Sequence, residues 1–235
     1  MRSGTFLSRL DKCVQKYDLL KHPFYQSWAA GNLTREDLRD YAQDYYHHVE
    51  AFPAYLAEFA LRLDEGELRR AVLAKLVDEK GGNSASPELS RRSHAELWLD
   101  FVEGFDGGRV YKWRPPVKEV RDLIGWFHHI ASEGMPEEAL AAFYAYESQV
   151  PGIAAEKDRG LRDLYGADSR TRAYFTLHQT ADVYHSNVWR QQLDMLVEAK
   201  PGATERALGA AEKAAQALWT ALDGIESRRQ AKVAA

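Results

Sequence analysis

The 235-residue sequence has one cysteine, Cys13, which excludes a disulfide framework within the chain and a zinc site made of several thiolates. No apolar stretch approaches the ~18 residues of a membrane span. The net charge of -4 argues mildly against nucleic acid or an acidic membrane as a partner. Charged residues interrupt the N-terminus before any apolar run, so we expect no signal peptide. These absences predict a cytoplasmic protein that binds neither nucleic acid nor membrane.

A strand-like alternation of apolar and polar residues is also missing, whereas apolar residues recur at helical spacing almost everywhere. Proline and glycine mark breaks between the helical segments, and Thr34 is a good N-cap for a long helix because Glu36 and Asp37 follow it. No repeat or biased linker divides the chain. We therefore predict an all-α fold, a single domain over residues 1–235, with seven to eight helices and a frayed tail from about residue 227.

Metal-capable side chains recur in the stretch from His178 to His185, where Asp182 lies between the two histidines. In a helix these positions, i, i+4 and i+7, share one face. Two imidazoles and one carboxylate suit iron, manganese or zinc better than calcium. The alternative is a polar helix face with an Asp–His ion pair, and this stretch alone favours neither interpretation.

Other parts of the chain could complete a site for two metal ions, which needs about six carboxylates and imidazoles from facing helices. Glu147 lies among apolar and aromatic residues, where an unpaired carboxylate is costly. Glu79 ends one predicted helix, and His94 lies on the apolar side of another. Taken alone, Glu79 is more simply interpreted as a solvated acid at a helix end, and His94 as a histidine of the core. The candidate ligands are Glu79, His94, Glu147, His178, Asp182 and His185.

Two further groups have an ordinary interpretation as well as a functional one. His47 and Glu50 share a helix face. They could orient the metal ligands, or they could form a simple ion pair. Lys157 closes the predicted helix that begins at Glu137, after a break at Pro151-Gly152. A cation is favourable at such a helix end, although in a pocket Lys157 could be an amine of lowered pKa.

Motifs spread over residues 6–222 resemble the CADD family, the chlamydial protein associating with death domains and its bacterial relatives. That family belongs to the haem-oxygenase-like dimetal oxidases, related in fold to the PqqC and TenA proteins. The motifs are His22-Pro-Phe-Tyr25-Gln-x-Trp28, Tyr46-His-His-Val-Glu-Ala-Phe-Pro53, Asp78-Glu79, His94-x-x-Leu-Trp98, Tyr146-Glu147-Ser-Gln-x-Pro151 and His178-x3-Asp182-x2-His185.

The resemblance implies synthesis of para-aminobenzoate for folate, with two transition metal ions (Fe/Fe or Mn/Fe) that activate dioxygen. It implies that the ring comes from the protein's own Tyr25 and the amine from Lys157, so that the protein is consumed after about one turnover. It places Tyr41, Tyr146 and Tyr174 along the route to the metals. It also implies a homodimer and an external reductant.

One departure from the family pattern concerns the stretch from Gly81 to Ser93, which is inserted between Glu79 and His94. A continuous helix would separate these two ligands by roughly 22 Å at ~1.5 Å per residue. The chain must therefore loop out and return if both residues bind metal. Glu88 is a possible substitute for Glu79, but it faces a different side of the helix from His94.

Two other functions remain open at this point. One is a PqqC-like or other haem-oxygenase-like oxidase that acts on an external small molecule. The other is a helical protein-interaction module, for which six inward ligands would have no purpose.

Overall fold

The computed structural model describes residues 3–82, 92–106 and 114–233, and over these residues it contains ten α-helices, one 3-10 helix and no strand. The all-α class is therefore confirmed, whereas the predicted number of seven to eight helices is too low. The elements are α1 (Ser3–Gln15), η1 (Leu19–Lys21), α2 (Pro23–Ala29), α3 (Arg35–Arg62), α4 (Glu67–Glu79), α5 (His94–Asp106), α6 (Lys118–Glu133), α7 (Pro136–Glu147), α8 (Val150–Asp163), α9 (Ser169–Ala199) and α10 (Ala203–Val233).

One reason for the larger number is that the predicted helix from Glu137 to Lys157 is two helices. Helix α7 ends at Glu147 and α8 begins at Val150. Pro151 lies in the first turn of α8, where its missing N–H is no loss, but it could not continue the hydrogen bonds of α7. Lys157 consequently lies in the middle of α8, and its interpretation as a cation at a helix end is wrong.

The start of α3 follows the prediction. Thr34 is the N-cap, its hydroxyl accepts a hydrogen bond from the backbone N–H of Asp37, and the Asp37 side chain accepts one from the backbone N–H of Thr34. This reciprocal capping box satisfies two backbone donors that the helix leaves free. Gly31 closes the preceding segment with a φ of 73°, a conformation that favours glycine.

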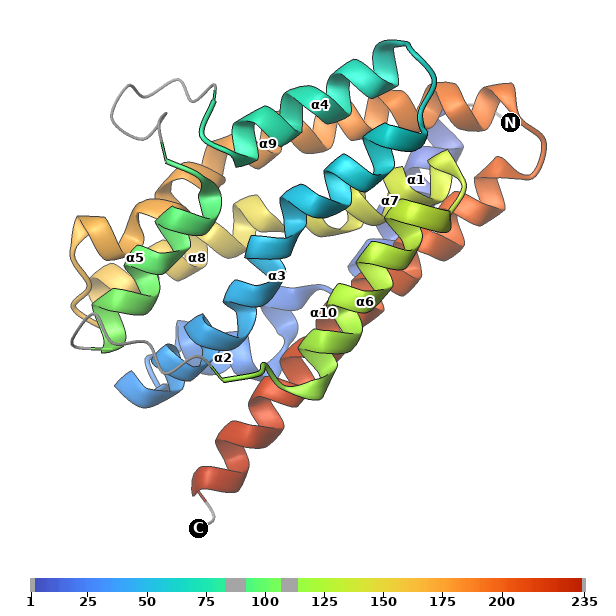
Figure 1. The fold of residues 1–235 in the computed structure, drawn as a ribbon. Coiled ribbons are helices and arrows are strands. Elements are labelled where there is room, and N and C mark those ends of the chain that lie inside the picture. The colour runs from blue at the N-terminus through green and yellow to red at the C-terminus, as the bar shows by residue number, and fades with distance from the viewer. Residues whose placement is uncertain (1–2, 83–91, 107–113, 234–235) are drawn as a thin grey trace.

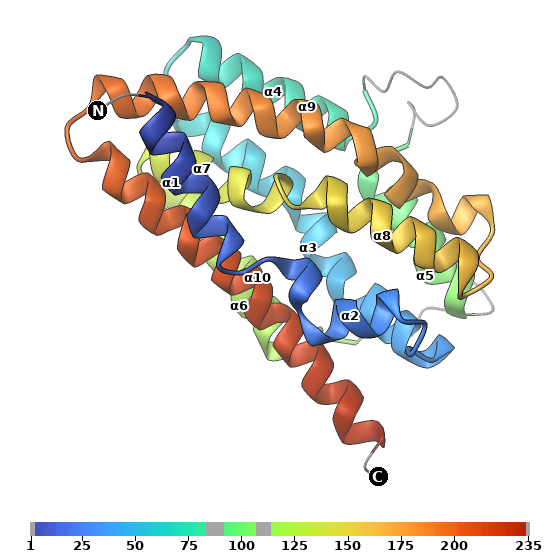
Figure 2. The same ribbon diagram turned by 180° about the vertical axis from the view of Figure 1, so that it is seen from behind.

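The helices pack around a shared aromatic and aliphatic core (Figures 1 and 2). Helix α3 runs through the bundle and contacts α4, α5 and α6, while α9 contacts α5, α7 and α8. Helix α10 packs along α6 and α7, and its C-terminal part extends beyond the other helices in both views. Long helices from distant parts of the sequence thus surround one buried interior.

Helix α10 continues to Val233, beyond residue 227, where the sequence predicts that the tail begins. Two basic residues of this last part hold it against the start of α3. Arg228 pairs with Asp44 at 2.5 Å, and Lys232 pairs with Glu36 at 2.6 Å.

The segment between α4 and α5 decides whether two of the predicted ligands can meet. Gly81 has a φ of 86°, and a Cβ there would lie 2.7 Å from the backbone of Arg92. A glycine therefore allows the two ends of the 83–91 segment to approach each other. Residues 83–91, including Glu88, lie outside the described residues. The prediction that the chain returns is confirmed, since Glu79 and His94 are in contact. No described helix combines the length and apolar character that a membrane crossing requires.

Candidate functional site

The structure brings the six predicted metal ligands together from four helices. Glu79 ends α4, His94 begins α5, Glu147 ends α7, and α9 contributes the other three on one face. None of the six is more than 7% exposed. Three carboxyl groups and three imidazoles buried together carry a desolvation cost that only mutual pairing or a bound cation offsets.

One side of this cluster is formed by Glu79, His94 and His178. His94 Nδ1 lies 2.8 Å from Glu79 Oε2 and 3.1 Å from His178 Nε2. His178 Nδ1 donates to the backbone carbonyl oxygen of Tyr174 at 2.7 Å, so Nε2 carries the lone pair that faces His94. Burial lowers the pKa of His178 to about 4, which keeps the imidazole neutral and able to bind metal at neutral pH.

The other side of the cluster contains a lysine that the sequence did not single out. Lys75, one turn before Glu79 on α4, is 2% exposed. Its Nζ lies 2.7 Å from Glu79 Oε1, 3.2 Å from Glu147 Oε1 and 3.3 Å from Asp182 Oδ1. Glu79 thus presents one oxygen to the two histidines and the other to Lys75.

Charge pairing controls the protonation of this cluster. Burial lowers the pKa of Lys75, but the carboxyl groups of Glu147, Glu79 and Asp182 outweigh it and hold the pKa well above its usual value. Burial, reinforced by the neighbouring acids, raises the pKa of Glu147 to about 8 although Lys75 opposes this. The indole N–H of Trp189 donates to Glu147 Oε2. Glu147 Oε1 has no hydrogen-bond partner of good geometry among the described residues.

The chemistry of these donors fits a transition metal, because buried imidazole and carboxylate groups are ligands of iron and manganese. Their present arrangement is different. Over residues 3–82, 92–106 and 114–233, no group of three His, Cys, Asp or Glu side chains is placed so that it could hold an ion directly. Lys75 Nζ lies among the three carboxyl groups, and His185 Nε2 lies 3.4 Å from Asp78 Oδ2. The ligand assignment therefore stays a prediction.

A second buried lysine lies beside the predicted ring source. Lys157 Nζ donates to Tyr25 Oη at 2.9 Å and also hydrogen-bonds to Tyr41 Oη. The two phenol oxygens are 3.1 Å apart. Lys157 Nζ lies 4.4 Å from the ring centroids of both tyrosines and within 6 Å of Trp28, Tyr45, Trp98 and Phe175.

No carboxylate of the described residues opposes the effect of burial on the pKa of Lys157. Burial among aromatic rings lowers the pKa of Lys157 well below its usual value. Burial also raises the pKa of Tyr25, only partly opposed by its hydrogen bond with Tyr41. Burial therefore favours the free amine of Lys157 and the neutral phenol of Tyr25, and a free amine has the lone pair that a nucleophile needs.

Tyr146 and Tyr174 lie between the two lysines. Both line a cavity of about 10 Å³ on the side of Lys75 and one of about 30 Å³ on the side of Lys157. The Tyr174 ring stacks on His178 with centroids 3.9 Å apart and meets Trp98 edge-on at 4.8 Å. Aromatic contacts thus lead from the candidate ligands towards Tyr25, along tyrosines that the resemblance selects.

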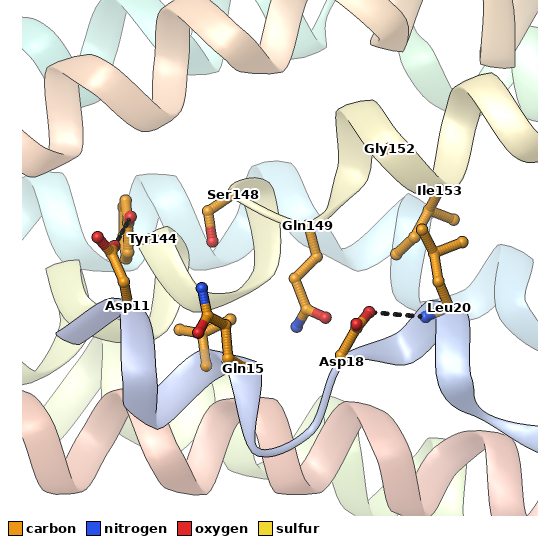
Figure 3. Close-up of a pocket in the computed structure, with 10 residues that line it drawn as sticks. Asp11, Gln15, Asp18, Leu20, Tyr144, Ser148, Gln149, Gly152 and Ile153 are labelled. Carbon is orange, nitrogen blue, oxygen red and sulfur yellow. Dashed lines mark hydrogen bonds between the residues drawn. The ribbon is translucent and has the colours of Figure 1, made fainter. Parts of the chain in front are cut away.

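A larger groove of about 300 Å³ opens between α1 and the α7–α8 junction, where Asp11, Gln15, Asp18, Tyr144 and Gln149 face it (Figure 3). None of the predicted site residues lines it. It shares only Ile153 with the cavity beside Lys157. The largest of the cavities described here is therefore separate from the candidate site.

The sequence held a signal for Lys75 that was not used, namely its i, i+4 spacing from Glu79. The expected role of His47 and Glu50 in orienting ligands gains no support. Glu50 is exposed and accepts a hydrogen bond from Tyr46, while the buried neighbour His48 packs against Tyr146 and Phe127. His22 of the first motif has a structural role, because it caps α2 and contacts Asp223 of α10.

Residues 39–219 match the family model described as iron-containing redox enzyme. A 4-aminobenzoate synthase of Chlamydia pneumoniae is 34% identical over 194 residues, 82% of this chain and 83% of that protein. Another, of Nitrosomonas europaea, is 35% identical over 237 residues, 96% of this chain and 92% of that protein. A pyrroloquinoline-quinone synthase of Rhizobium meliloti is more distant, 28% identical over 158 residues, 66% of this chain and 59% of that protein.

Among solved structures, a CADD-like protein of Nostoc punctiforme superposes with a TM-score of 0.71. It covers 96% of this chain and 99% of its own at 16% identity, so it supports the fold alone. The resemblance found in the motifs is confirmed by these relatives. The chain belongs to the haem-oxygenase-like family of iron-containing redox enzymes, among the relatives of the 4-aminobenzoate synthases.

Proposed function

We propose that this protein makes 4-aminobenzoate from the ring of its own Tyr25, with Lys157 as the source of nitrogen and dioxygen as the oxidant. The observation that carries the proposal is the buried contact of Lys157 Nζ with Tyr25 Oη at 2.9 Å. It joins two residues that are 132 positions apart in the sequence, and burial at this contact lowers the pKa of the Lys157 amine well below its usual value.

The structure of the product explains why this contact matters. 4-Aminobenzoate carries its nitrogen and its carboxyl group para to each other, as a tyrosine ring carries Oη and Cβ. Nitrogen must therefore replace Oη, which leaves as water, and the Nζ–Cε bond of Lys157 must break to release the amine. Cβ must be oxidised by dioxygen to a carboxyl group, with loss of its bond to Cα. Lys157 Nζ lies on the Oη side of Tyr25, where the new C–N bond would form. Such a pre-positioned amine spends no translational entropy in reaching the ring.

Cavity size favours an internal substrate over an external one. The cavities beside Lys157 and Lys75 measure about 30 and 10 Å³. Sites for small organic ligands typically enclose several hundred Å³, whereas a water-sized guest needs on the order of 10–15 Å³. Dioxygen is a small guest of the water-sized kind, so these cavities are large enough for it. A substrate that already belongs to the chain needs no larger space.

The proposal includes two transition metal ions, Fe/Fe or Mn/Fe, and an external reductant. The residues that would hold the ions are Glu79, His94, Glu147, His178, Asp182 and His185. Such ions supply the activation of dioxygen, a redox chemistry that side chains lack. Tyr146, Tyr174 and Tyr41 separate the ligands from Tyr25 and exclude bulk water. Consumption of Tyr25 would limit each chain to about one turnover.

Growth of a bacterial strain that lacks the chorismate-based synthesis of 4-aminobenzoate tests the proposal. We expect the wild-type chain to restore growth and the Tyr25→Phe variant to fail. Tyr184→Phe is the matched control, because Tyr184 is 68% exposed and touches neither lysine. Equal rescue by Tyr25→Phe would remove Tyr25 from its role and would favour an external substrate.

The purified protein gives a second, direct measurement. After exposure to ferrous iron, reductant and oxygen, intact-mass and peptide analysis should locate the loss of the side chain at Tyr25. Tyr41 is the informative comparison, since it contacts the same amine. A loss of the side chain at Tyr41 with Tyr25 intact would show that the ring comes from Tyr41 and not from Tyr25.

A further inference from the structure

We propose that Lys75 makes the two cation positions of the candidate centre unequal: its ammonium group occupies one, so the first metal ion binds beside it and a second must displace it. This inference rests on the metal centre of the proposed function and not on its product. It concerns how the protein takes up metal.

Geometry divides the cluster into two halves that share Glu79. Glu79 Oε2 lies 2.8 Å from His94 Nδ1, and His94 Nδ1 lies 3.1 Å from His178 Nε2. These three side chains are candidate donors on the side of Glu79 that faces away from Lys75, and they would have to shift to hold an ion. Glu79 Oε1 instead faces Lys75 Nζ, together with Glu147 and Asp182. The ammonium group therefore stands where the remaining carboxyl groups would meet a second ion.

Lys75 has no evident alternative position. Its backbone is fixed in α4 one turn before Glu79, and its side chain is 2% exposed. Its other neighbours include the Phe52 ring, 6.0 Å from Nζ, and the cavity it lines also contains Val49. Leaving the carboxyl groups would move a charged amine onto apolar surface without a partner, which is strongly unfavourable.

Charge balance gives the same order of binding. Once metal binding releases the proton of Glu147, the three carboxylates are neutralised by one ammonium group and one divalent ion. A second divalent ion would leave two positive charges in a buried site if the ammonium stayed. Its entry therefore requires the Lys75 side chain to move away, and this requirement weakens the binding of that ion alone.

Titration of the full-length protein with Mn²⁺ under anaerobic conditions tests the inference, with free Mn²⁺ counted by electron paramagnetic resonance. We expect the wild type to bind one equivalent tightly and a second at least about 100-fold more weakly. Lys75→Met, expressed and purified with Mn²⁺, should reduce the gap, which is the ratio of the two Mn²⁺ dissociation constants, at least about tenfold because no ammonium group must leave. Lys75→Arg retains the positive charge and should keep the gap.

Lys157→Met is the matched control, because it removes a buried lysine that touches none of the candidate ligands. Its two Mn²⁺ affinities should equal those of the wild type. Two equivalents bound by the wild type with one affinity, no bound Mn²⁺ at all, or an unchanged gap in Lys75→Met would each overturn the inference. The wild-type titration decides even if Lys75→Met does not fold. Product formation is not measured, so failure of the proposed function would leave this result intact.

Discussion

Two lysines of this protein are almost equally buried, Lys75 at 2% and Lys157 at 4%, yet their surroundings make them chemically different. Lys75 lies among three carboxyl groups and is held as a cation. Lys157 lies among aromatic rings and two phenols, where burial lowers its pKa well below the usual value and favours the free amine. Burial alone therefore does not predict the role of a lysine. Its counter-charges decide whether it balances charge or presents a lone pair.

Removal of Lys157 should have the largest effect on the reaction. If its nitrogen enters the product, Lys157→Met should make no 4-aminobenzoate, because no other described amine lies beside Tyr25. Protein labelled with ¹⁵N at the lysine side chains should release ¹⁵N-labelled product from the wild type. Lys75 would be labelled too, but its ammonium group has no lone pair. Product without label, or labelled product from Lys157→Met, would contradict the assignment.

Removal of Lys75 should instead have the largest effect on stability. In metal-free protein, Lys75→Met leaves three buried carboxyl groups without their cation, and we expect a loss of about 3–5 kcal/mol in the free energy of unfolding. Urea denaturation followed by circular dichroism measures it, and added Mn²⁺ should restore part of the loss. Lys157→Met should cost much less, since it removes hydrogen bonds of a neutral amine, about 0.5–1.5 kcal/mol each. Equal losses would show that the two sites do not differ in charge.

The sequence predicted much of the fold, and the two lysines show where such prediction ends. Helical periodicity and breaks at glycine and proline located the helices, and Thr34 was recognised as a cap because capping is local. Acidic and histidine residues on apolar faces pointed to the six ligands. The segment from Glu137 to Lys157 is predicted as one helix with a break at Pro151-Gly152, whereas the structure ends α7 at Glu147 and begins α8 at Val150.

Long-range contacts could not be predicted from spacing. Lys75 is close to Glu79 in the sequence, but its burial depends on Glu147 and Asp182, which α7 and α9 bring from far along the chain. The contact of Lys157 with Tyr25 came only from the resemblance to a family, because no local pattern relates α2 to α8. Features that depend on neighbouring residues can be predicted from the sequence, whereas the charged partners of a buried side chain depend on tertiary packing.

The pH dependence of stability should reveal the neutral form of Lys157. Its pKa is lowered in the folded protein, so between that value and the unfolded value near 10.5 the unfolded chain binds more protons. Stability contributed by this residue must therefore rise with pH in that range and stop rising above it. The free energy of unfolding of the wild type minus that of Lys157→Met should increase by up to about 1.4 kcal/mol per pH unit from pH 7 to 10. A flat or falling difference would mean that the amine is charged.

An exposed lysine gives the smallest expected effect and completes the comparison. Lys16 pairs with Glu212 at 2.8 Å, a distance close to that of Lys75 and Glu79, but its side chain is 57% exposed. Water solvates the charged groups of Lys16 and Glu212 before and after pairing, so Lys16→Met should change the free energy of unfolding far less than Lys75→Met does. Urea denaturation of the three methionine variants side by side would check the order. A loss at Lys16 as large as that at Lys75 would mean that pairing distance, and not exclusion of water from the carboxyl groups, sets the energy of these contacts.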